Sequence, residues 1–263
     1  MTNCCVLIPY YNDGKNLISS LDSIDVFDSG PDVVVVDDGS QEKASTVLQA
    51  YTGTLSVKLI TLPENKGIET ALNTGLQYCL NNYDYIARLD CGDTCKNQRI
   101  SKQIDFLNSN PEHGLIGSWV DFVTENGEFI FTSKLPSTHS EIKRKMFLNS
   151  MFVHPSVMIR SKVLLDIGLY PLDRPAAEDF ALFFKIVKKY KTANLPEPLL
   201  NYVFSPTSIS SKKRKTQIKS RIKILIDNFE LGFIPLYGLI RSVLLLASPR
   251  SLTVKLRKHL TDY

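Results

Sequence analysis

Two acids, Asp90 and Asp93, stand just past a short apolar run in the stretch YIARLDCGDTC. The apolar run has the length of a buried strand. Carboxylate oxygens are the ligands that hard divalent cations such as Mg²⁺ and Mn²⁺ prefer. Asp and Thr are also good caps for the start of a helix. The pair therefore predicts either a metal site or the beginning of the next helix.

Polar groups follow three other apolar runs in the same way, and each alone would make a good turn or cap. They are Pro9 to Asn12, Asp37 to Ser40 and Asn65 to Gly67. In an open parallel sheet, ligands bind beyond the carboxyl ends of the strands. So many acids gathered at one edge would repel one another and raise their pKa values unless a cation is present. We therefore predict Mn²⁺ or Mg²⁺ at Asp90 and Asp93, bridging to phosphate groups of a ligand.

The elements that must position these groups alternate between two periods. Strands are predicted at 4–10, 32–40, 57–62 and 84–90, and helices at 13–25, 67–79 and 96–107. Strands that are apolar throughout and separated by helices indicate a parallel sheet covered on both faces. The later residues predict a hairpin at 115–132 around an Asn-Gly turn, a strand at 155–160 and a helix at 176–190. Phe180, Phe183, Phe184 and Val187 are expected on the inward face of that helix.

Composition indicates a globular protein with one sizeable core, since 43% of the 263 residues are hydrophobic. Five cysteines without a C-x-x-C pair do not form a disulfide framework, which favours a reducing cytosol. Cys91 and Cys95 lie beside the acids, but no second cysteine or histidine pair accompanies them. A zinc site, which needs at least three such ligands, is therefore disfavoured.

The charge of the chain is uneven. From residue 205 onward there are 12 Lys and Arg against 3 Asp and Glu, whereas the rest of the chain has 19 against 24. The basic segment 212–223 leads into the apolar segment 229–247, which charges interrupt too often for a membrane span. A helix pair on an anionic membrane surface is the favoured interpretation, with a packing or dimer helix as the alternative. Nucleic acid is disfavoured because no nucleic-acid motif accompanies the lysines. The expected lipid contacts are Lys212, Lys213, Arg214 and Lys215.

Five segments together resemble the family-2 glycosyltransferases with the GT-A fold. They are VLIPYYN, VVVVDDGS, ENKGIETALNTGL, ARLDCGD and AAEDFALFFKI, in the order and spacing of that family. The resemblance covers roughly residues 4–205 and implies an α/β fold with a largely parallel central sheet, helices on both faces and additional C-terminal helices. It implies a catalytic domain at 1–205, with a nucleotide-binding half (1–110) and an acceptor-binding half (111–205). Residues 206–263 would form a membrane-association region.

Within the family, the sequence is most similar to bacterial enzymes that extend O-antigen units on diphospho-undecaprenol. The resemblance implies an inverting, metal-dependent transfer of a hexose, with β-1,3-galactosyl transfer from a UDP-sugar to lipid-linked GlcNAc as the first choice. Such an enzyme would work as a peripheral protein at the cytoplasmic face of the inner membrane. No Q-x-x-R-W motif is present, which favours a single transfer over polymerisation.

The resemblance also implies roles for individual residues. The implied donor-binding residues are Pro9, Tyr11, Asp38, Asn65, Lys66, Arg88 and Asp90. Asp38 would accept a hydrogen bond from the uracil N–H, and Asp93, with Asp90, would reach the metal. Asp179 matches the catalytic base, with Glu178 beside it, while His154 stands before the acceptor region without an assigned role.

Departures from the family pattern leave alternatives open. Gly92 stands where many relatives have an Asp, and Leu72 where many have an Arg, a charge that Arg88 would have to supply. Glu178 and Asp179 are also typical of an ordinary helix start, and His154 of a structural histidine. The rival functions are a glucosyl- or rhamnosyltransferase, a nucleotidyltransferase, and a non-catalytic protein that binds nucleotide-sugars or lipids.

Overall fold

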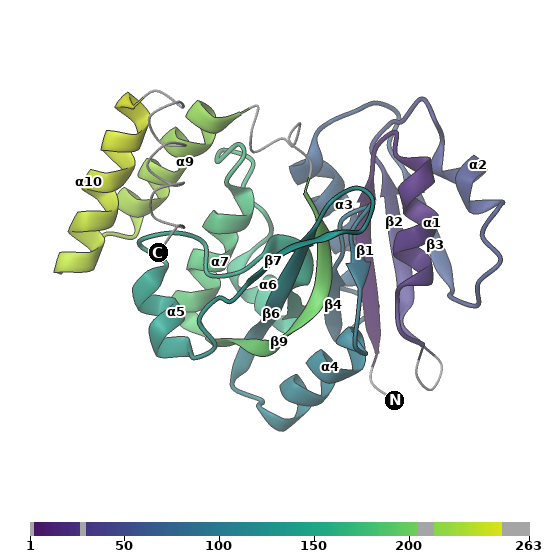
Figure 1. Ribbon diagram of the computed structural model, residues 1–263, viewed down its shortest axis with the longest axis horizontal. Helices are drawn as coiled ribbons and strands as arrows, with labels where there is room; N and C mark the ends of the chain where they lie inside the picture. The colour runs from purple at the N-terminus through teal and green to yellow at the C-terminus, as the bar shows by residue number, and fades with distance from the viewer. Residues whose placement is uncertain (1–2, 27–29, 205–212, 249–263) are drawn as a thin grey trace.

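The four apolar runs of the first half form parallel strands joined by helices, as predicted. Their bounds are β1 Cys4–Tyr10, α1 Gly14–Asp22, β2 Asp32–Asp37, α2 Ala44–Leu48, β3 Val57–Thr61, α3 Ile68–Cys79 and β4 Tyr85–Arg88. The structure, a computed structural model, describes residues 3–26, 30–204 and 213–248. The strands lie in the order β3-β2-β1-β4, so that β1 is central among them (Figure 1).

The second half continues the same sheet with mixed strand directions. Its elements are β5 Thr94–Cys95, α4 Arg99–Ser109, β6 His113–Val123, β7 Phe129–Ser133, α5 His139–Lys145, the 3₁₀ turn η1 His154–Ser156, β8 Met158–Arg160, α6 Ser161–Ile167, α7 Glu178–Lys189 and β9 Lys191–Val203. β8 is antiparallel to both β4 and β6, and β9 is parallel to β6. The predicted hairpin is confirmed, because β6 and β7 pair antiparallel on either side of Gly127.

β9, a strand of 13 residues, was not predicted from the sequence. Pro196 and Pro198 interrupt its pattern, and proline is typically excluded from a central strand because it cannot donate to the ladder. The register between β6 and β9 shifts next to Pro198, which is how the sheet accommodates the prolines. The pairing nevertheless places Val203 beside the acids that follow β4.

Alternate residues of the parallel strands face opposite sides of the sheet, and both sides are covered. Leu7 and Val34 face a layer that contains α3, α5, α6 and α7. Val6 and Val33 face a layer that contains α1, α2 and α4. This burial on both sides explains why the strands are apolar throughout.

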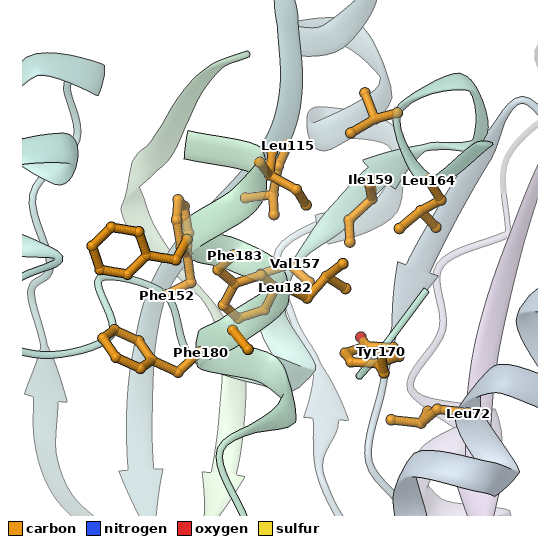
Figure 2. Packing of buried hydrophobic residues seen from close by; sticks show 14 of the residues in the cluster. Leu72, Leu115, Phe152, Val157, Ile159, Leu164, Tyr170, Phe180, Leu182 and Phe183 are labelled. Carbon is orange, nitrogen blue, oxygen red and sulfur yellow. The ribbon is translucent and has the colours of Figure 1, made fainter. Parts of the chain in front are cut away.

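The helix α7 packs against the sheet with the face that the sequence predicted, since Phe180, Phe183, Phe184 and Val187 are all buried. Figure 2 shows Phe180, Leu182 and Phe183 among side chains of the neighbouring elements. The start of this helix is thereby fixed against the core, and the two acids at that start are fixed with it.

The tail forms two helices, α9 Arg214–Asp227 and α10 Phe233–Ala247, which lie beside α7 and α5 (Figure 1). Ile224 and Leu225 of α9 join the core around α7. Arg214, one of the residues expected to contact lipid, donates from its guanidinium to the carbonyls of Leu245 and Ser248 at the end of α10. Lys212 lies outside the described residues. None of the described helices is long and apolar enough to cross a membrane.

Candidate active site

The predicted polar groups lie at one edge of the sheet. β2, β1 and β4 are parallel neighbours, so the segments that follow them begin side by side. Asn12 donates its backbone N–H to Ser40 Oγ at 3.0 Å and accepts at Oδ1 from the N–H of Gln41 at 2.8 Å. These bonds join the loop after β1 to the loop after β2.

Asp38 joins the loop after β2 to the loop after β3. Its two carboxylate oxygens accept the N–H groups of Lys66 and Gly67 at 2.8 and 2.9 Å. Burial raises the pKa of Asp38, and the two N–H groups oppose that rise by stabilising the carboxylate. Each oxygen keeps a lone pair, so the carboxylate can accept one more donor, such as the ring N–H expected from the sequence.

The segment from Asp90 to Asp93 is a tight turn that Ser20 of α1 holds by two hydrogen bonds. Ser20 Oγ accepts the N–H of Gly92 and donates to the carbonyl of Asp93, each at 2.9 Å. Gly92 has a φ of +101°, a backbone conformation that residues with a side chain rarely adopt. A further Asp at this position would therefore strain the turn, which gives a physical reason for the departure noted in the sequence.

Asp93 is buried in this turn, with only 4% of its surface exposed. Oδ1 accepts the N–H of Val203 at 2.9 Å, whereas Oδ2 is buried and has no hydrogen-bond partner. Burial, and then the charge of Asp90, raises its pKa well above the usual range. Asp93 does not start a helix, because the next two residues form β5 and α4 begins only at Arg99. The helix-start alternative is therefore wrong, and a bare buried carboxylate oxygen is a feature that a cation would satisfy.

The second pair of acids lies at the start of α7. Glu178 is only 7% exposed, and its Oε2 has no partner. Burial and the neighbouring Asp179 raise the pKa of Glu178 to about 8. Burial also raises the pKa of Asp179 to about 6, and the charge of Asp90 contributes to that rise. The charge of Asp90 contributes to the raised pKa of Glu178 as well, which links the two pairs of acids electrostatically.

Arg88 is not placed as the sequence suggested. Its side chain is almost wholly buried, and its guanidinium donates to the carbonyls of Leu7 and Leu89 and to the carboxylate of Asp90. A fourth donor, Nε, faces His154 Nε2 at 3.4 Å. Nearly all its donors are therefore occupied inside the protein, so we no longer assign Arg88 to the donor phosphates.

The sheet order and the acids at its edge agree with a known family. The family described as Glycosyl transferase family 2 matches residues 5–168, well over half of the chain. This chain belongs to that family. The chain is therefore a family-2 glycosyltransferase, as the resemblance implied.

Two relatives cover most of its length. The amylovoran biosynthesis glycosyltransferase AmsE of Erwinia amylovora is 30% identical, over 90% of this chain and 92% of its own. The UDP-Gal:alpha-D-GlcNAc-diphosphoundecaprenol beta-1,3-galactosyltransferase of Escherichia coli is 27% identical, over 95% of this chain and 92% of its own.

Solved structures confirm the GT-A fold. The S. aureus protein TarS (residues 1–349) in complex with UDP-GlcNAc superimposes with a TM-score of 0.71 at 18% identity, over 94% of this chain and 71% of TarS. The mannosyltransferase PcManGT of Pyrobaculum calidifontis, in complex with GDP-Man and Mn²⁺, gives a TM-score of 0.67 at 17% identity. It covers 99% of this chain and 81% of its own.

The remaining donor-site candidates of this glycosyltransferase differ in exposure. Pro9 is buried inside β1, whereas Tyr11 is about half exposed just beyond the strand. Asn65 and Lys66 are exposed in the loop that Asp38 holds, and Lys66 Nζ lies 3.8 Å from Glu64. Tyr11 is therefore better placed than the ring of Pro9 to lie against a base.

Two tyrosines at the site were missed from the sequence. Burial raises the pKa of Tyr202, and the charges of Asp90, Asp93 and Asp179 add to that rise. Tyr170 lies near Arg88 and Asp179, and its hydroxyl is 2.7 Å from His154 Nε2. Tyr202 belongs to the strand that the prolines hid, and nothing around Tyr170 in the sequence distinguishes it from a core residue. The pairing of β9 was therefore needed to find Tyr202, and the contact with His154 was needed to find Tyr170.

Proposed function

We propose that this enzyme is an inverting glycosyltransferase that moves a hexose from a UDP-sugar to GlcNAc-diphospho-undecaprenol in O-antigen biosynthesis. Galactose in a β-1,3 linkage is the first choice, because the E. coli relative is named for that transfer. The amylovoran relative supports the alternative, a hexosyl transfer to another surface polysaccharide. Both alignments span at least 90% of this chain and of the relative, so either reaction is proposed for the whole chain.

The observation that carries the proposal is the bare Oδ2 of Asp93 beside Asp90, in the same field as the acids of α7. Mn²⁺ or Mg²⁺ fits this donor set, with Asp93 as the main ligand and Asp90 beside it. No group of three or more acidic, histidine or cysteine side chains in described positions could hold the ion alone. Diphosphate and water oxygens would complete its shell, and the bound ion would neutralise charge on the leaving diphosphate.

Asp179 is proposed as the base. Its pKa of about 6 leaves it ionised at neutral pH yet basic enough to take a proton. The acceptor hydroxyl gives its proton to the carboxylate as its oxygen attacks the anomeric carbon, and the bond from that carbon to the diphosphate breaks. UDP leaves with the electron pair, so an α-linked donor gives a β-linked product. Asp38, Tyr11 and Lys66 are proposed to hold the nucleotide.

We propose further that residues 1–205 are the catalytic domain and that 206–263 hold the enzyme, as a peripheral protein, at the cytoplasmic face of the inner membrane. The support is the packing of α10. Its small residues Gly238 and Ser242 are buried, and a Cβ on Gly238 would lie 2.1 Å from the carbonyl oxygen of Phe147. The helix is therefore held by its small face. Ile234 and Leu239 pack against the core beside this face. Six other large apolar side chains are exposed, at the spacing of a single helical stripe: Phe233, Leu236, Tyr237, Ile240, Val243 and Leu244.

Charge favours an anionic lipid surface as the partner of this outward stripe. The exposed basic residues of the two helices are Lys215, Lys219, Lys223 and Arg241, and Lys213 directly precedes α9. Asp227 is the single acid within α9 and α10, and it pairs with Arg174 at 2.8 Å. Exposed apolar side chains combined with basic neighbours are typical of helices that lie in a membrane interface.

The test of the proposed reaction is direct. Purified protein is incubated with a GlcNAc-diphospho-lipid analogue and a panel of UDP- and dTDP-sugars, with Mn²⁺ or with EDTA. Metal-dependent transfer from one UDP-hexose, with inversion at the anomeric carbon, is the expected result. Transfer that EDTA leaves unchanged would contradict the metal assignment, and retention of configuration would contradict Asp179 as the base.

A further inference from the structure

Two buried side chains, Tyr170 and Arg88, and the partly buried His154 between them form a chain of contacts that ends on Asp90. The Tyr170 hydroxyl lies 2.7 Å from His154 Nε2, and Arg88 Nε lies 3.4 Å from the same nitrogen. The other end of the guanidinium is paired with the carboxylate of Asp90. No part of the proposed reaction uses the histidine or the tyrosine.

The protonation of His154 follows from this geometry. The Nε–H of Arg88 can only donate, so the nitrogen that faces it must carry a lone pair. His154 is therefore neutral, with its proton on Nδ1, and its one Nε2 lone pair is shared between the Tyr170 hydroxyl at 2.7 Å and Arg88 Nε–H at 3.4 Å. Burial, and then the charge of Arg88, lowers the pKa of His154 to about 3, in agreement with a neutral ring. This histidine accepts hydrogen bonds and is not available as a base.

The chain of contacts also joins the two halves of the sheet. Arg88 ends β4, whereas His154 belongs to η1 in the second half. Tyr170 is bound to α3 by Asn73, whose Oδ1 accepts the N–H of Tyr170 at 3.0 Å. Asn73 Nδ2 in turn donates to the Tyr170 carbonyl at 2.9 Å. The imidazole is therefore held from both sides, with its acceptor nitrogen fixed opposite Arg88.

We propose that His154 is a positioning residue: its neutral Nε2 fixes the guanidinium of Arg88, and Arg88 fixes the orientation of Asp90 at the donor and metal site. The inference rests on the proposed function for the role of Asp90. The carbonyls of Leu7 and Leu89 hold Nη1 of Arg88, so His154 Nε2 is the contact that fixes the Nε side of the guanidinium. Without it the guanidinium can tilt about the two carbonyl bonds, which shifts the end that is paired with Asp90. Loss of the imidazole is therefore expected to weaken donor and metal binding, although the imidazole itself contacts neither the donor nor the metal.

The first arm of the test measures binding of UDP with Mn²⁺ by titration calorimetry. His154→Leu is expected to weaken binding about tenfold, the size of one lost hydrogen bond to a charged group. Tyr170→Phe keeps the imidazole and should have a smaller effect. His139→Leu is the matched control, since His139 contacts Thr192 Oγ1 at 3.3 Å, apart from the Arg88 network. Unchanged binding in folded His154→Leu would overturn the proposal.

The second arm asks whether His154 acts through Asp90. In an Asp90→Asn background, His154→Leu should weaken binding by less than about twofold, since residues in one network are not additive. A full, additive loss would indicate a general structural role and would overturn the proposal.

The third arm does not depend on the proposed function. Nitrogen NMR of the histidines should show His154 with a proton on Nδ1 and none on Nε2 between pH 6 and 8. A proton on Nε2 would overturn the network. If no protein variant binds UDP, the proposed function fails, and this spectrum still decides whether the network exists.

Discussion

Helices α7 and α10 have similar apolar sequences and opposite surroundings. In α7, the stretch FALFFKIV buries Phe180, Phe183 and Phe184 against the sheet. In α10, the stretch FIPLYGLI leaves Phe233 82% exposed and Tyr237 and Ile240 about half exposed. Burial of apolar area is the main favourable term in folding, so α7 holds the domain together, whereas α10 retains an apolar surface for a partner.

The reason for the difference is the position of the small residues. Gly238 and Ser242 let α10 approach the backbone at Phe147 closely, so that Ile234 and Leu239 reach the core while the side chains of the stripe stay exposed. The last residues before α7 and its first residues are instead tied to α9, since Ser220 donates to the Pro175 carbonyl at 2.9 Å and Arg221 stacks on Phe180. The start of α7, where the proposed base lies, is therefore held in place by α9, the helix that precedes α10 in the chain.

The largest expected effect is at the start of α7. Asp179→Asn removes the proposed base while keeping the shape of the side chain, so turnover should fall about 10³-fold or more. Binding of UDP with Mn²⁺ should change little, because Asp179 acts on the acceptor. The measurement is single-turnover transfer together with calorimetric UDP binding. Turnover within tenfold of the wild type would remove Asp179 from the mechanism.

The next prediction compares substitutions in α7 and α10 by their effect on the free energy of unfolding. Phe183→Ala opens a cavity in the core and should lower the free energy of unfolding by about 3 kcal/mol or more. Phe233→Ala, its exposed counterpart, should change it by less than about 0.5 kcal/mol. Urea denaturation in the absence of lipid measures both. Equal destabilisation by the two substitutions would mean that a protein surface covers α10 in solution.

The outward stripe predicts a loss of lipid binding. Leu236→Ser with Ile240→Ser should weaken binding to phosphatidylglycerol-containing vesicles about 30-fold, since each of the two apolar side chains in the interface contributes roughly 1 kcal/mol. Val26→Ser with Leu165→Ser is the matched control, because both residues are exposed apolar side chains elsewhere. Vesicle flotation measures the binding. If the stripe variant instead converts a dimer to a monomer with unchanged flotation, the stripe is a protein interface.

The fold was predictable where one strong pattern recurred. Apolar runs that are buried on both faces revealed β1, β2 and β4, and the phenylalanine spacing revealed the inward face of α7. The strand β9 was hidden because its prolines break the pattern while its pairing with β6 survives them. Two short apolar helices such as α7 and α10 cannot be distinguished by composition, because their burial depends on what packs against them.

The candidate site was predictable as a set of residues but not as a set of contacts. The acids at the strand ends share an edge as expected from parallel pairing, because topology alone brings them there. The sequence could not reveal that Arg88 is enclosed by Leu7 and His154, since those contacts join residues far apart in the chain. The bare oxygen of Asp93 likewise depends on Val203 of β9.

The smallest expected effect concerns Glu178, a buried acid at the start of α7. The first turn of α10 contains no acid. The pKa of Glu178 is raised from 4.5 to about 8 in the folded protein. The folded state therefore favours the protonated acid, and this contribution to stability is complete below pH 4.5 and is lost as the pH rises through 8. Glu178→Gln removes the titration while keeping the size of the side chain.

Between pH 7 and 9, the free energy of unfolding of the wild type should therefore fall by about 1 to 2 kcal/mol relative to Glu178→Gln. Glu230→Gln is the matched control, because Glu230 is an exposed acid just before α10 and its substitution should leave the pH dependence of the wild type unchanged. Urea denaturation across the pH range measures all three proteins. Parallel curves for the wild type and Glu178→Gln would show that Glu178 ionises freely, and the electrostatic contrast between the two helix starts would then be absent.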